Sequence, residues 1–84
     1  MKSTVKDKVR VTGRGCVIIF EPDEEIHITD KVVCNGNEFS IAGIERLSFL
    51  KNVGLILRPN DLAQEKINIG DDITVLQNEE KGES

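Results

Sequence analysis

Apolar residues alternate with polar ones in short segments along most of the chain, and this pattern constrains the fold more than any other feature. The period of two recurs in residues 9–11, 26–28, 39–41, 53–57, 67–69 and 73–75. Successive side chains of a strand point to opposite faces, so strict alternation indicates strands with one buried face. The sequence therefore predicts six or seven short strands.

Turn signals separate these segments. Asn35-Gly36 is the strongest, because a type I′ hairpin turn needs positive φ at both central residues. Gly13 and Gly15 flank Arg14 at a predicted tight reversal, where positive φ costs a residue with a Cβ about 1 kcal/mol. The glycines with predicted structural roles are Gly13, Gly15, Gly36 and Gly70 in turns and Gly54 inside an apolar strand, where close packing of another backbone is expected.

Short strands at this spacing predict an all-β fold, a small closed antiparallel β-barrel with six or seven strands. A chain of 84 residues supports one domain, with an expected barrel core at about 5–76 and a polar tail at 77–84. Residues 61–66 are compatible with one helical turn, for which Asp61 is the expected N-cap. Residues 26–32 resemble residues 67–73, and each segment reads as a strand, a corner with an aspartate and a second strand. The fold is therefore expected to use one corner twice.

The net charge of -4 is unevenly distributed. Residues 1–15 hold five basic residues against one acidic residue, whereas residues 21–30 hold five acidic residues and no Lys or Arg. Affinity for nucleic-acid phosphates comes mainly from concentrated Lys and Arg, so a net acidic chain is a poor general binder of nucleic acid.

No enzyme chemistry is indicated. His27 has no nucleophile partner at a recognisable spacing, and we expect no metal, nucleotide or other cofactor. The longest apolar run, residues 16–20, is too short to cross a membrane, and no signal peptide is visible, so we expect a cytoplasmic protein. Cys16 and Cys34 are then expected as reduced, buried small hydrophobes, rather than as a disulfide or a redox pair.

Four blocks carry a family resemblance: residues 12–17 (Thr-Gly-Arg-Gly-Cys-Val), 43–45 (Gly-Ile-Glu), 52–58 (Asn-Val-Gly-Leu-Ile-Leu-Arg) and 67–70 (Ile-Asn-Ile-Gly). In this order they resemble the second domain of elongation factor Tu, a member of the translation-factor β-barrel family. In that family the barrel follows a GTP-binding domain, but this chain has no Gly-x-x-x-x-Gly-Lys-Ser/Thr phosphate loop. The resemblance thus implies the barrel alone, without GTPase activity.

The resemblance also implies a position for a transfer-RNA acceptor-end site. Glu45 matches a glutamate that meets the terminal adenosine, and Asn52 and Asp7 match polar residues of the aminoacyl pocket. Other pocket positions depart from the family pattern, at Lys6, Val9, Ile19 and Leu47. RNA ends are held by stacking on side chains and by polar contacts to base edges, and most of the family's residues for these contacts are replaced in this chain.

Two functions from different classes follow. The first is a non-enzymatic binding or adaptor module whose partner is a protein, with candidate contacts at Phe20, Glu21, Asp23, Glu24, Glu25, Phe49 and Leu50 around an acidic hairpin. Its apolar members are either exposed or fill the open ends of the barrel. If they are exposed, serine in place of Phe20 and Phe49 should abolish binding and leave the thermal midpoint nearly unchanged. The alternative is binding of a transfer-RNA acceptor end or ribosomal RNA through Arg10, Arg14, Glu45, Arg46, Asn52 and Arg58.

Overall fold

A computed structural model describes residues 1–46 and 51–77. In these ranges the fold is mostly β, as predicted, with seven strands and one short helix. They are β1 (Lys2–Thr4), β2 (Asp7–Val11), β3 (Gly15–Phe20), β4 (Lys31–Cys34), β5 (Asn37–Arg46), β6 (Val53–Arg58), α1 (Asn60–Lys66) and β7 (Asp72–Leu76).

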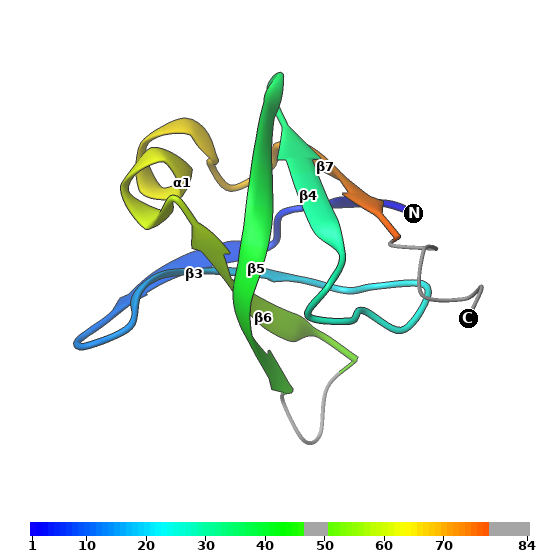
Figure 1. Ribbon diagram of the computed structural model, residues 1–84, viewed down its shortest axis with the longest axis horizontal. Helices are drawn as coiled ribbons and strands as arrows, with labels where there is room; N and C mark the ends of the chain where they lie inside the picture. The colour runs from blue at the N-terminus through cyan, green and yellow to red at the C-terminus, as the bar shows by residue number, and fades with distance from the viewer. Residues whose placement is uncertain (47–50, 78–84) are drawn as a thin grey trace.

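The strands form one antiparallel sheet in the order β1-β7-β4-β5-β6-β3-β2, which curls into a half-barrel (Figure 1). Its two edge strands, β1 and β2, are consecutive in the chain and are joined by Val5 and Lys6. Val5 N–H donates to Asp71 O at 2.9 Å on the β7 side, whereas Lys6 N–H donates to Ile19 O at 2.8 Å on the β3 side. One continuous segment therefore changes sheet partner at this point.

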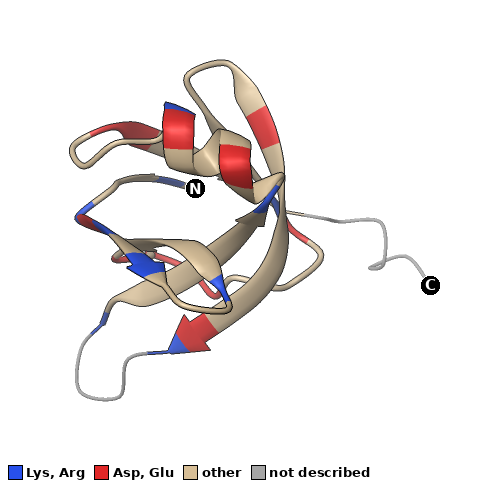
Figure 2. Cartoon of the chain, turned by 90° about the vertical axis from the view of Figure 1, so that its left-hand side faces the viewer, with Lys and Arg blue, Asp and Glu red and all other residues tan. Residues whose placement is uncertain are grey.

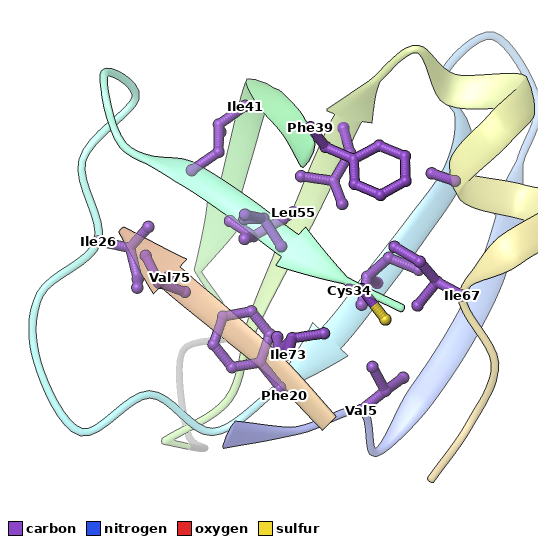
Figure 3. Packing of buried hydrophobic residues seen from close by; sticks show 14 of the residues in the cluster. Val5, Phe20, Ile26, Cys34, Phe39, Ile41, Leu55, Ile67, Ile73 and Val75 are labelled. Carbon is purple, nitrogen blue, oxygen red and sulfur yellow. The ribbon is translucent and has the colours of Figure 1, made fainter. Parts of the chain in front are cut away.

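The concave face of the sheet encloses the hydrophobic core (Figure 3). Phe20, Phe39, Leu55 and Ile73 all point into it and are fully buried. Helix α1 packs against β3 and β6 and adds Ala63 to the same core. Over the described ranges, no helix has the length and apolar character needed to span a bilayer.

The predicted turn chemistry is confirmed at several glycines. Asn35 and Gly36 have φ of 51° and 80° and join β4 to β5 through a two-residue hairpin turn. Gly13 has φ of 86°, and the N–H of Arg14 donates to Val11 O at 2.9 Å across this turn. Positive φ at the third position defines a type II turn, which favours glycine there.

The predicted repeated corner is present, but the strands predicted before it at residues 26–28 and 67–69 are not, because neither segment lies in a strand. His27 N–H donates to Asp30 Oδ2 at 2.9 Å, and Asp30 N–H returns a bond to His27 O at 2.9 Å. Asn68 N–H donates to Asp71 Oδ2 at 2.8 Å, and Asp71 N–H returns a bond to Asn68 O at 3.0 Å. Each corner leads directly into one strand of the antiparallel pair β4 and β7. The same hydrogen-bonded corner therefore precedes both strands.

Helix α1 lies where a helical turn was predicted, but its N-terminus differs. The N-cap is Pro59 and no side chain caps the helix, so the prediction of Asp61 as N-cap is wrong. The neighbouring Asn60 instead reaches back to β3. Its Oδ1 accepts a hydrogen bond from Cys16 N–H at 2.8 Å, and its Nδ2 donates to Cys16 O at 3.0 Å and Leu57 O at 3.1 Å.

Asn60 therefore replaces a rung of the β3–β6 ladder. The register pairs Val17 with Ile56, and one further pair would place Cys16 opposite Leu57. The Asn60 amide lies at that point and binds the backbone groups of both residues, so it holds α1 against the sheet.

Both cysteines are free and buried, as predicted. Burial raises the pKa of the Cys16 and Cys34 thiols above the ordinary 9.0, because an apolar environment disfavours the thiolate. Nearby cations oppose this shift at Cys16, whereas nearby carboxylates add to it at Cys34.

These thiols predict alkaline destabilisation. Because their pKa is higher in the folded than in the unfolded state, their stabilising contribution is complete below pH 9 and is lost as the pH rises through the folded-state pKa. We expect the free energy of unfolding, measured by urea denaturation, to fall from about pH 9 upward. The Cys16→Ala/Cys34→Ala variant is the control and should show a shallower fall. Equal slopes for the two proteins would contradict this assignment.

Candidate functional site

Strands β3 and β6 are apolar on both faces. Their inner side chains, Ile18 and Leu55 among them, lie in the core. The register places Val17 beside Ile56 and Ile19 beside Gly54 on the opposite, convex face. Val9 of β2 lies opposite Val17 and extends this face by one strand. We call this surface the outer platform, formed by Val9, Val11, Val17, Ile19 and Ile56.

Two glycines leave room for side chains of the outer platform. A Cβ on Gly54 would lie 2.9 Å from Val17 Cγ1, and a Cβ on Gly43 would lie 3.3 Å from Ile56 Cδ1. The valine and isoleucine side chains thus occupy the space that side chains at the glycines would fill, and Val17 is only 6% exposed. Close packing at Gly54 was predicted, but the prediction of a backbone neighbour is wrong, because the nearest atom belongs to a side chain.

The β2–β3 hairpin extends away from the rest of the sheet, at the left of Figure 1. Val9 and Val11 are consequently 38% and 37% exposed, although the alternation predicted one buried face for this strand. Arg10, between them, is also exposed. Figure 2, in which the hairpin faces the viewer, shows basic segments along it and acidic segments on α1.

Phe20 does not lie on the surface. It is 0% exposed in the core beside Val53, so its prediction as an exposed partner contact is wrong. Its burial is what the alternative, that it fills an open end of the barrel, requires. It ends β3 on the inward-facing side of the strand, where the alternation set by Cys16 and Ile18 places it. The other two apolar candidates, Phe49 and Leu50, lie outside the described residues.

The acidic residues 21–25 do not form the expected hairpin. Strands β3 and β4 are not neighbours in the sheet, so this segment belongs to a crossover between them. Several of its carboxylates already have partners within the chain. Glu21 is 3.1 Å from Lys6 Nζ, Glu25 is 3.9 Å from Arg46, and Glu24 accepts a hydrogen bond from Gln77 at 2.8 Å. Asp23, also predicted as a contact, lies exposed in the same segment.

The residues predicted to bind RNA are dispersed. Glu45 is on the convex face beside Gly54, in one register row with Ile19 and Asp7, and it forms an ion pair with Arg14 at the hairpin turn. Arg10 lies on the opposite face of β2, in the row of Cys16.

The remaining RNA candidates are no closer together. Arg46 lies at the end of β5 near Glu25, exposed Arg58 pairs with Ser40 at the other end of β6, and Asn52 precedes β6. The structure does not gather these cations into one patch.

No cluster of three or more His, Cys, Asp or Glu side chains in residues 1–46 and 51–77 is arranged to hold a metal ion. An open pocket of about 330 Å³ lies between β1 and β7. Its single carboxylate, Asp72, accepts a hydrogen bond from Thr4 Oγ1 at 3.3 Å. His27 is exposed, with Glu25 Oε2 at 4.0 Å from its Nε2 and Asp30 Oδ2 at 3.9 Å from its Nδ1.

Sequence reasoning missed the outer platform, although a signal for it was present. Residues 16–20 form a continuous apolar run, and such runs are typical of strands that are covered on both faces. Sequence reasoning also missed that Lys8 links two distant parts of the chain by hydrogen bonds. Its Nζ donates to Gln64 O at 2.9 Å and Ile67 O at 2.8 Å, which joins β2 to the end of α1.

Comparisons of the chain with protein-family models, curated proteins and solved structures find no match.

Proposed function

We propose that this chain is a non-enzymatic binding module whose partner is a protein, and that the partner binds the outer platform. The observation that carries the proposal is the apolar character of β3 and β6 on both faces. Their inner face is buried in the core, whereas Val9 and Val11 at the margin of the outer face remain exposed. Apolar surface of this kind, bordered by charged residues, is typical of protein interfaces.

The same proposal includes a closed barrel of the elongation factor Tu domain 2 type. The bonds of Val5 and Lys6 to opposite ends of the sheet support closure through a shared first strand. Two of the blocks that carry the resemblance fall on regular parts of the fold, since residues 12–17 run from the β2–β3 turn into β3 and residues 52–58 contain β6. Glycines at 13, 15 and 70 have the positive φ that these turns require.

The surface chemistry favours a protein over RNA. Four basic candidates would have to act together to bind phosphates, but Arg14 is paired with Glu45, Arg46 is near Glu25, and Arg10 lies on the other face of β2. The outer platform itself carries no aromatic side chain on which a base could stack.

Photo-cross-linking in living cells tests the proposed function. Benzoylphenylalanine at the position of Val9 or Val11 should capture a discrete protein, because these side chains border the outer platform. The matched control is benzoylphenylalanine at Ile69, an apolar residue that is 61% exposed at the Asn68–Asp71 corner, is not part of the outer platform and should capture nothing comparable.

A second variant makes the result specific to the surface. Ile19→Lys adds a charge to the outer platform without touching the core, so it should abolish capture and keep the thermal midpoint close to that of the unchanged chain. Capture that persists in Ile19→Lys, or equal capture at Ile69, would count against the proposal. Nuclease-sensitive adducts at Val9 would instead support RNA binding.

A further inference from the structure

The hydrogen bonds of Asn60 show which backbone groups of β2 are unused. Both the N–H and the C=O of Cys16 bind the Asn60 side chain, so they point away from β2. Cys16 lies directly opposite Arg10 in the antiparallel ladder. Opposed residues in such a ladder alternate between pairs that exchange both hydrogen bonds and pairs that exchange none. The N–H and C=O of Arg10 therefore point to the free side of β2.

The same alternation applies to Lys8, whose N–H is already occupied. It donates to Asp7 Oδ1 at 2.8 Å, which leaves the Lys8 C=O on the free edge. Helix α1 packs against β3 and β6, and β2 packs mainly against β3. Within residues 1–46 and 51–77, three adjacent groups thus form a short edge without hydrogen-bond partners, the N–H and C=O of Arg10 and the C=O of Lys8.

The side chains along this edge define what could pair with it. Val9 and Val11 project to the outer platform and are partly exposed, whereas Lys8 and Arg10 project to the other face. Residues opposite each other on adjacent strands have neighbouring side chains, so a partner strand needs apolar residues beside the valines and an acidic residue beside Arg10.

A second copy of this chain does not fit the requirement. Antiparallel pairing of two β2 strands about Arg10 would place Arg10 opposite its counterpart, and pairing about Val9 would place Lys8 opposite Arg10. Like charges directly opposite each other destabilise a strand pair. Basic side chains on an edge strand are a common means of preventing self-association.

We propose that β2 is a strand-addition site for an extended segment of a partner protein in which apolar residues alternate with acidic ones. The inference rests on the proposed function, because it specifies how a protein partner extends the sheet beside the outer platform. One partner residue exchanges two backbone hydrogen bonds with Arg10, its carboxylate lies beside the Arg10 guanidinium, and its two neighbours cover Val9 and Val11. Backbone bonds supply affinity in this mode, and alternate side chains supply specificity.

An NMR titration of the ¹⁵N-labelled chain tests this inference. The probe is the acetylated, amidated peptide Thr-Val-Glu-Val-Glu-Val-Thr, and the matched control peptide has lysine in place of both glutamates. The glutamate peptide should shift the amide resonances of β2 and slow hydrogen exchange at the Arg10 amide by about tenfold or more at saturation, since that amide becomes hydrogen-bonded. The lysine peptide should bind at least about tenfold more weakly.

Charge reversal distinguishes specific pairing from general attraction. Arg10→Glu should reverse the preference between the two peptides, whereas Lys31→Glu, the same charge change on β4, should leave it unaltered. The inference is overturned if neither peptide binds, if both bind equally, or if the shifts map away from β2. If neither peptide binds but benzoylphenylalanine at position 9 still captures a protein, strand addition at β2 is excluded and the proposed function is retained.

Discussion

Replacing Phe20 by alanine is expected to lower the free energy of unfolding by about 3–5 kcal/mol. Phe20 is fully buried at the inner end of β3, among core residues that come from several strands (Figure 3). Deletion of its ring removes apolar contacts and leaves a cavity that the surrounding sheet fills only in part. Small domains are stable by roughly 5–15 kcal/mol, so the loss is a large fraction of the total. Urea denaturation monitored by circular dichroism measures it.

The matched control is Val9→Ala, which shortens an apolar side chain on the exposed hairpin. It should change the free energy of unfolding by no more than about 0.5 kcal/mol, the range typical of surface substitutions. If Phe20 were exposed, as one reading of the sequence predicted, its substitution would leave the thermal midpoint nearly unchanged. A Phe20→Ala variant as stable as Val9→Ala would place the ring on the surface and would contradict the buried position.

Local chemistry explains why the turns and corners could be predicted. The Asn35-Gly36 hairpin and the paired corners at Asp30 and Asp71 depend on φ preferences and on hydrogen bonds within four residues. A short stretch of sequence contains all of that information. The same holds for the alternation, which predicted a mostly β fold, although its two segments at residues 26–28 and 67–69 did not form strands.

The surface depends on pairings across the sheet, which a single sequence does not reveal. The position of Phe20 depends on where β3 ends relative to the core, and the exposure of Val9 depends on how far the hairpin extends beyond it. Glu45 and Asn52 were predicted as site residues from matching motifs alone. The ion pair of Glu45 with Arg14, distant in sequence, could be seen only once the strands were in register. The apolar run at residues 16–20 signals a strand that is apolar on both faces, but the register is needed to show which residues join it in the outer platform.

The contact between Gly15 and Asn60 carries the second large prediction. A Cβ on Gly15 would lie 2.2 Å from Asn60 Oδ1, and Gly15 has φ of 85°, which disfavours any residue with a Cβ. Gly15→Ala should therefore displace the Asn60 amide from Cys16 and Leu57, in addition to straining the backbone. We expect a loss of about 3 kcal/mol or more, from the strain and from buried backbone groups that lose their partners.

Gly13→Ala separates the two causes, because Gly13 has a matching φ of 86° but no heavy atom within 4 Å of its added Cβ. It should cost only the backbone strain, about 1–2 kcal/mol. In a double-mutant cycle, Gly15→Ala should cost less in an Asn60→Ala background than in the unchanged chain, since the clashing amide is then absent. Additive effects of the two substitutions, measured as free energies of urea unfolding, would show that Gly15 acts through its φ alone. If the cost of Gly15→Ala in the Asn60→Ala background falls to that of Gly13→Ala, the rest of its cost in the unchanged chain comes from displacing the Asn60 amide, which holds α1 on the sheet.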